Sequence, residues 1–162
     1  QIKKIKFMKR KELLELYDAL SNVSNKGSIK FKIAIFKNLN QIEEVSKFIT
    51  NAEKEDAKIL SDYQSDYTEI LKKYGTQNND MYVIEKTSPD YAKALKEIKK
   101  LEVTHKDSIA LYEKKKKEFA EFMESEDEMV FIPFEIKEDL LPEDILGNEL
   151  KKLIDHKIFI LE

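Results

Sequence analysis

The sequence is poor in residues that bend, cross-link or break a chain. Its 162 residues include no cysteine, no tryptophan, three glycines and three prolines. Without cysteine these residues form no disulfide framework, zinc–thiolate site or thiol nucleophile. All-β folds need turn residues every 8–12 positions or so, which so few glycines and prolines do not supply. No uncharged run approaches the roughly 18 residues that a membrane-spanning helix needs. The absences favour a mainly α fold with no membrane partner.

Apolar residues recur at helical spacing in three stretches. Residues 9–23 predict an N-terminal helix, which ends before Gly27. Residues 28–74 contain no glycine or proline and predict one long helix, whose second half alternates apolar spacings of three and four, as in a coiled coil. A second long helix is predicted over residues 89–125. Because only about a dozen residues join the two long helices, we expect them to fold back as an antiparallel hairpin.

Four short segments are typical of strands. Residues 81–86 lie at the hairpin connection, and Pro133 limits the segment 129–136 to an edge strand. Residues 2–8, 129–136 and 157–161 are expected to form a small β cluster. The predicted fold class is therefore mainly α (α+β): a long antiparallel, coiled-coil-like helical hairpin with an extra N-terminal helix and a β cluster from the chain ends. We predict a single domain over 1–162, with a helical stalk over about 28–125 and a base from 1–27 and 126–162.

The net charge of −3 hides an asymmetry. Residues 1–40 carry ten lysines and arginines against three acids, whereas residues 41–162 carry nineteen against twenty-nine. The favoured interpretation is that the two segments attract each other within the fold. A second is a basic face on Lys30, Lys32 and Lys37 for phosphate or nucleic acid, although Phe31 and Phe36 between them are better explained as helix core. A third is that the acidic residues of 124–144 form a docking surface or mimic nucleic acid.

Motifs for catalysis are missing. The three glycines are isolated, so no phosphate-binding loop occurs, and His105 and His156 lack the spacing of zinc ligands. We therefore predict no catalytic residues, no metal, no cofactor and no enzymatic activity. Tyr63 and Tyr67 lie on the long apolar seam, where core packing is the favoured interpretation and an aromatic binding cleft or an oligomer contact are the alternatives.

Two segments carry a resemblance. The stretch Lys30–Asn38 followed by Ile42-Glu43-Glu44, and Leu141–Ile145 followed by Gly147, Leu150 and Leu153, resemble a family of small phage-encoded helical proteins of unknown function. The last residues, from Asp155 onward, depart from that pattern. The resemblance implies a bacteriophage or prophage origin and supplies no activity. It nominates Lys37 and Asn38, either as a buried polar contact between helices or as part of a binding site.

Together these features predict a non-enzymatic, phage-encoded interaction protein in the cytoplasm of a bacterial host. It would act through protein–protein contacts in virion assembly or in modulation of a host protein. We expect a protein partner and homo-oligomers, because long helices with surplus apolar residues need a covering surface. The alternatives are nucleic-acid binding by the Lys-rich N-terminal segment and small-molecule (nucleotide) binding in an interhelical cleft. The candidate binding residues are Lys30, Lys32, Lys37, Asn38, Tyr63 and Tyr67.

Overall fold

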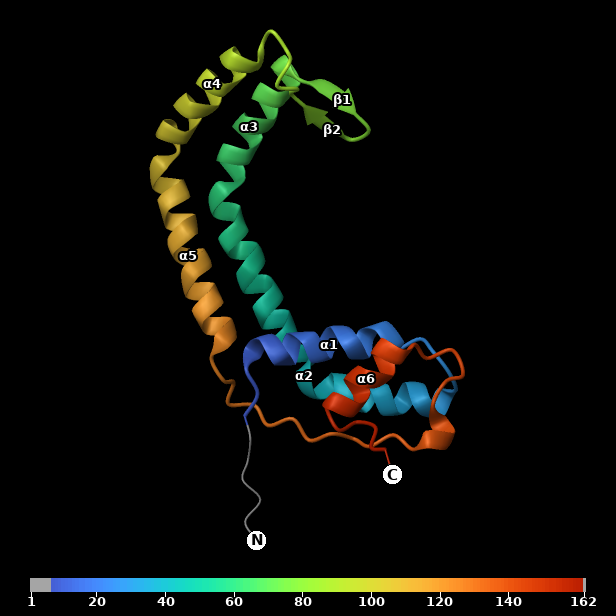
Figure 1. Ribbon diagram of the computed structural model, residues 1–162. Helices are drawn as coiled ribbons and strands as arrows, with labels where there is room; N and C mark the ends of the chain where they lie inside the picture. The colour runs from blue at the N-terminus through green and yellow to red at the C-terminus, as the bar shows by residue number, and fades with distance from the viewer. Residues whose placement is uncertain (1–6, 162) are drawn as a thin grey trace. The chain divides into compact units, whose positions relative to one another are not determined.

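A computed structural model describes residues 7–161 and is mainly helical, with one small antiparallel sheet (Figure 1). This confirms the coarse fold class. The elements in chain order are α1 (Arg10–Val23), α2 (Ile29–Ala57), the 3₁₀ turn η1 (Lys58–Leu60), α3 (Ser61–Tyr74), β1 (Thr76–Asn78), β2 (Met81–Val83), α4 (Tyr91–Thr104), α5 (Lys106–Glu124), the 3₁₀ turn η2 (Glu138–Leu140) and α6 (Gly147–Asp155).

The chain divides into two compact units. Unit 1 comprises Gln1–Asn51 and Ala120–Glu162, and unit 2 comprises Ala52–Phe119. These boundaries fall inside α2 and α5, and so differ from the predicted boundaries between stalk and base. The expectation of a single folding domain stays a prediction.

Unit 1 contains the hydrophobic core. The apolar face of α1, with Leu13, Leu16 and Leu20, packs in one cluster with Phe31 and Ile35 of α2. Helix α6 contacts α1 and contributes Leu153 to the same cluster. Figure 1 shows α1 and α6 beside α2. The turn between α1 and α2 uses Gly27 at φ +69°, where a side chain would be strained and its Cβ would lie 2.7 Å from Cγ of Pro142. This turn explains why the first helix ends where the sequence predicts.

Unit 2 contains α3, the β1–β2 hairpin and α4, together with the end of α2, η1 and most of α5. Helices α3 and α4 contact each other. Strands β1 and β2, which follow α3 in the chain, pair antiparallel with Gln77 opposite Tyr82 (Figure 1). The turn of this hairpin places Asn79 at φ 55°, a conformation that asparagine tolerates better than most residues. Strand β2 agrees with the predicted segment at 81–86. Strand β1 lies outside the predicted strand segments.

The two long predicted helices are each interrupted. The helix expected over 28–74 contains the 3₁₀ turn η1, where Leu60 has φ −96° and ψ 6°. The helix expected over 89–125 is interrupted at His105, with φ −100° and ψ 20°, between α4 and α5. Apolar periodicity continues through both places, so the pattern alone does not reveal the breaks.

The predicted β cluster is wrong where the structure describes it. Residues 129–136 and 157–161 form no strand, and of the strand expected over 2–8 only Phe7 and Met8 lie within the described residues, without strand structure. The remaining contacts are a single bridge between Lys9 and Glu126 and a hydrogen bond from the Ile136 amide to the Ile158 carbonyl, 2.7 Å long. At Ile132 and Phe134 the segment 129–136 instead takes its backbone partners from side chains of α2, described next.

Candidate interaction surface

Helix α2 is apolar on two opposite sides. One side supplies Phe31, Ile35 and Ile42 to the core of unit 1, all fully buried. The other carries Ile29, Ile33 and Phe36, whose side chains are 75%, 52% and 60% exposed. At about 100° per residue these three lie within one narrow stripe, opposite the buried side. In a monomer, the side of an amphipathic helix that faces away from the core is normally polar. Exposed apolar side chains on that side of α2 are therefore unusual.

The apolar stripe ends within α2. Farther along the same side, the exposed or half-exposed positions are polar, namely Asn40, Glu43, Glu44 and Lys47. On this side of α2 the exposed apolar residues are thus confined to the first two turns or so. They lie beside a shallow hollow of about 300 Å³ that Ser24, Ile29, Lys32, Ile33, Phe36 and Lys37 line. We call Ile29, Ile33 and Phe36, with Lys30, Lys32 and Lys37 around them, the apolar–lysine face.

The lysines of this face differ from the other basic residues near the N-terminus. Within the described chain Lys30, Lys32 and Lys37 make no ion pair, and Lys37 instead places its Nζ 4.4 Å from the centre of the Phe134 ring. The basic residues that do pair reach the acidic C-terminal part of unit 1, with the bridges Lys9–Glu124, Arg10–Asp127, Lys11–Glu124 and Lys26–Glu149. The predicted attraction between the basic and acidic segments therefore operates within unit 1, and it leaves out these three lysines.

An extended segment lies along α2 next to the face. The Asn38 side chain donates Nδ2–H to the Phe134 carbonyl (3.0 Å) and accepts the Phe134 amide on Oδ1 (2.8 Å). Gln41 repeats the arrangement with Ile132, at 2.8 and 3.0 Å. In a sheet, the backbone of a neighbouring strand would bond the N–H and C=O groups of Ile132 and Phe134. Here two side-chain amides, one helical turn apart on α2, bond them instead. The odd and even residues of the segment then point to opposite sides, which leaves Val130, Ile132 and Phe134 exposed.

Asn38 itself does not belong to an accessible site. It is fully buried, and its Nδ2 also donates to the Ala34 carbonyl at 2.9 Å. Of the two interpretations that the resemblance left open, the geometry supports the buried polar contact, although the contact is to an extended backbone rather than to another helix.

Phe36 was assigned to the helix core, and that assignment is wrong. Phe31 is fully buried, but Phe36 is five residues farther along and lies about 140° around the helix. The sequence contained this signal, because the rows Phe31–Ile35–Ile42 and Ile29–Ile33–Phe36 are separate stripes of one helix.

Tyr63 and Tyr67 lie in unit 2, away from these residues in the chain. The centres of their rings are 6.1 Å apart, and the Tyr63 and His105 rings form a T-shaped pair with their centres 5.7 Å apart. Burial raises the pKa of the Tyr63 hydroxyl, and the nearby Glu102 carboxylate adds to the shift. His105 in turn places Nε2 2.9 Å from an Asp66 carboxylate oxygen.

The two tyrosines do not share one cleft. Tyr67 borders a hollow of about 300 Å³ with Tyr82 and Tyr91, whose other lining residues are mostly aliphatic, and Tyr63 is not among its lining residues. The hollow lies between α3, α4 and β2, so Tyr67 remains a candidate binding residue and Tyr63 packs against His105 instead.

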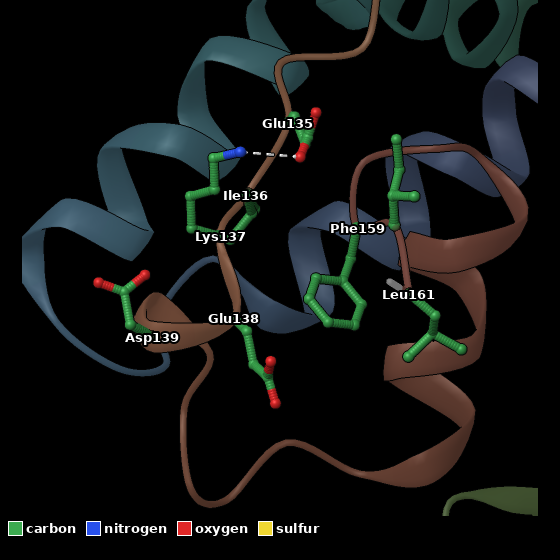
Figure 2. Close-up of a pocket in the computed structure, with 8 residues that line it drawn as sticks. Glu135, Ile136, Lys137, Glu138, Asp139, Phe159 and Leu161 are labelled. Atoms are coloured by element: carbon green, nitrogen blue, oxygen red, sulfur yellow. Dashed lines mark hydrogen bonds and ion pairs between the residues drawn. The ribbon is translucent and has the colours of Figure 1, made fainter.

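A larger hollow of about 580 Å³ lies near the C-terminal end of unit 1 (Figure 2). Figure 2 shows the Phe159 ring and Leu161 on one side, and the carboxylates of Glu135, Glu138 and Asp139 pointing in different directions on the other. Lys137 pairs with Glu135 at 3.2 Å. Within residues 7–161 no three histidine or acidic side chains are grouped closely enough to hold a metal ion.

Comparison with protein-family models, curated proteins and solved structures gives no match to this chain. The resemblance to phage-encoded proteins therefore stays a prediction. None of the helices formed by residues 7–161 is both long enough and apolar enough to cross a membrane.

Proposed function

We propose that this chain is a protein-interaction module that acts through the apolar–lysine face of unit 1. The observation that carries the proposal is the exposed stripe of Ile29, Ile33 and Phe36 on a helix whose opposite side already forms the core. Clustered apolar groups of this kind mark interaction sites in soluble proteins, because covering them removes apolar area from water. The role is binding rather than catalysis.

The proposal keeps the biological setting that the sequence suggested. The protein would be phage-encoded, would work in the cytoplasm of a bacterial host, and would contribute to virion assembly or modulate a host protein. Self-association, through contacts outside the apolar–lysine face, and a coiled-coil-like hairpin over residues 28–125 are part of the same proposal. The contact between α3 and α4 supports helices that fold back within unit 2.

Photo-crosslinking tests the proposed function. A photoreactive phenylalanine analogue would replace Ile33, and in a second chain it would replace the exposed Gln64 of α3 as a matched control. We expect a discrete protein adduct in the source cells from position 33, none from position 64, and loss of the adduct when Phe36→Ser is added. Equal labelling from both positions, or none from position 33, would contradict the proposal. An adduct with a second copy of the chain would identify the partner as the protein itself.

A second candidate function is small-molecule binding in unit 2. The hollow beside Tyr67, Tyr82 and Tyr91 has a volume near the lower end of the range for ligand sites, about 300–1,000 Å³. Aromatic side chains around an apolar floor suit a flat, weakly polar ligand such as a nucleobase. Thermal shifts across a nucleotide panel test this candidate: a shift that Tyr67→Ala abolishes supports it, and the absence of any shift argues against it.

A further inference from the structure

We infer that the partner segment bound by the apolar–lysine face is an acidic amphipathic helix of another protein. The inference rests on the proposed function and names the chemistry of its partner. Three features of α2 lead to it: the pitch of the apolar stripe, the position of the lysines beside it, and the absence of compensating acids.

The pitch of the stripe fits a helix. Ile29, Ile33 and Phe36 follow the spacing i, i+4, i+7, so they rise about 10 Å along one side of α2. A partner helix presents its own apolar side chains at the same repeat, and the ridges of one helix pack into the grooves of the other. The hollow of about 300 Å³ beside the stripe gives such side chains a place to enter.

The lysines border the stripe on both sides. At about 100° per residue, Lys32 lies on one flank of the stripe and Lys30 and Lys37 lie on the other. A helix seated on the stripe would therefore meet a positive charge along each of its edges. Carboxylates at its flanking positions would pair with these lysines at the rim of the contact, where charges govern the association rate and the choice of partner.

Nothing on this part of α2 neutralises the lysines. The first turn of α2 has no acidic residue, and the first acid in the helix is Glu43. The helix dipole adds a partial positive charge at the same end. Glu124, Asp127 and Glu149 of unit 1 pair with other basic residues, namely Lys9, Arg10, Lys11 and Lys26. Lysines without an ion pair within the described chain thus flank the exposed apolar groups.

The same features disfavour other occupants. In a two-fold symmetric dimer each face would meet its own copy, so that lysines would oppose lysines. Single-stranded nucleic acid is bound through aromatic stacking, but the stripe is mainly aliphatic and offers Phe36 as its aromatic ring. An acidic helix satisfies the apolar groups and the charges together.

A display library of helical peptides tests the inference with the full chain as target. Each peptide would carry a fixed apolar row at i, i+4 and i+7, and its flanking positions would be randomised among acidic, neutral and basic residues. Clones that also bind the double variant Ile33→Ser/Phe36→Ser would be discarded. We expect the remaining clones to be enriched in acidic flanking residues. Recovery of neutral or basic helices, or of no clone that distinguishes the two targets, would overturn the inference.

Charge reversal then tests the lysines. The double variant Lys32→Glu/Lys37→Glu should weaken binding of a selected acidic peptide about tenfold or more, and raising the salt concentration to about 0.5 M should weaken binding to the original chain. The matched control is Lys96→Glu/Lys99→Glu in α4, where exposed lysines also border a hollow, beside Val103. This control should leave the affinity within about twofold. Equal losses in both double variants would overturn the inference, because the effect would then be net charge.

Two further outcomes also decide the question. A dimer in sedimentation that Ile33→Ser/Phe36→Ser dissociates would show that a second copy occupies the face. Gel-shift binding of an oligonucleotide that exceeds peptide binding at the same salt, and is lost in Lys32→Glu/Lys37→Glu, would assign the face to nucleic acid. If crosslinking from position 33 finds a protein partner while the library returns no acidic helices, the proposed function stands and this inference fails.

Discussion

Units 1 and 2 are both built from helices with apolar stripes, yet only unit 1 has a buried interior. Among the described apolar residues that are buried, Ala94 is in unit 2 and the others, from Leu13 to Phe159, are in unit 1. In unit 1, α1, α2 and α6 share one core, against which residues of the segment before α6, such as Met129 and Phe131, also pack. In unit 2, α3 contacts α4, and a helix packed mainly against one neighbour leaves part of its apolar stripe in contact with water.

The comparison shows that helical periodicity measures amphipathicity but not burial. The stripes of unit 2 are as regular as those of unit 1, but their tyrosines and leucines stay half-exposed. Unit 2 adds surface ion pairs, such as Lys73–Glu97 and Lys72–Glu69. We therefore expect unit 1 to depend on its core and unit 2 to be less sensitive to any single side chain.

The largest expected effect is the loss of a core side chain. Phe31→Ala should lower the free energy of unfolding of unit 1 by about 3–5 kcal/mol, because it removes a fully buried ring and leaves a cavity. Tyr67→Ala in unit 2, at a half-exposed position, should cost at most about 2 kcal/mol. Urea denaturation followed by circular dichroism compares the two. Similar losses would mean that unit 2 has a core as demanding as that of unit 1.

The second largest loss of stability is expected when the buried Asn38–Phe134 contact is removed. Asn38→Leu leaves the Phe134 amide and carbonyl without their partner, at a cost of about 1–3 kcal/mol. Gln41→Leu is the matched control, because Gln41 makes the same pair of bonds to Ile132 at a more exposed position, where water can replace the side chain. We expect Gln41→Leu to cost less than about 1 kcal/mol by the same urea measurement. If the order is reversed, burial does not decide the strength of these bonds.

The paired amides also show what could be predicted from the sequence. The end of the first helix was predictable, because Gly27 acts locally, and the breaks at Leu60 and His105 were not. The start of α2 is also set locally, since the Ser28 hydroxyl accepts the Phe31 amide at 3.2 Å. The segment 129–136 was predicted as a strand because its composition suits extended backbone. Its actual partners, Asn38 and Gln41, lie some 90 residues earlier and carry no local signal. The lack of ion pairs at Lys30, Lys32 and Lys37 is likewise a property of the fold.

A smaller effect is expected at the Lys26–Glu149 pair of unit 1. Lys26 Nζ lies 2.6 Å from Glu149 Oε1, and the Leu146 amide donates to the same oxygen at 2.9 Å. These bonds hold the pKa of Glu149 below its ordinary value, with the Lys26 bond as the larger cause. The resulting stabilisation is complete above the ordinary pKa and is lost as the pH falls through the lower, folded-state pKa. Glu149→Gln should lower the free energy of unfolding at pH 7 by about 1 kcal/mol. It should also make the urea midpoint less dependent on pH between pH 5 and about pH 2.

The smallest effect is expected at the corresponding pair of unit 2. Glu97 accepts from Lys73 Nζ at 2.9 Å and from the Tyr74 hydroxyl at 2.7 Å, and these bonds lower the pKa of Glu97, the Lys73 bond most. The side chains of Lys73 and Glu97 are 60% and 36% exposed, against 23% and 11% for Lys26 and Glu149. Water competes for an exposed pair, so Glu97→Gln should change the urea midpoint less than Glu149→Gln does.

Salt separates the two pairs further. Raising the ionic strength to about 1 M shortens the Debye length to about 3 Å and should remove what remains of the Glu97→Gln effect. Part of the Glu149→Gln effect should persist, because the side chains of Lys26 and Glu149 are mostly shielded from water and salt screens a partly buried pair less. Urea denaturation of both variants in low and high salt measures the difference. An equal and salt-resistant loss in both units would show that unit 2 depends on its surface pairs as unit 1 depends on its core.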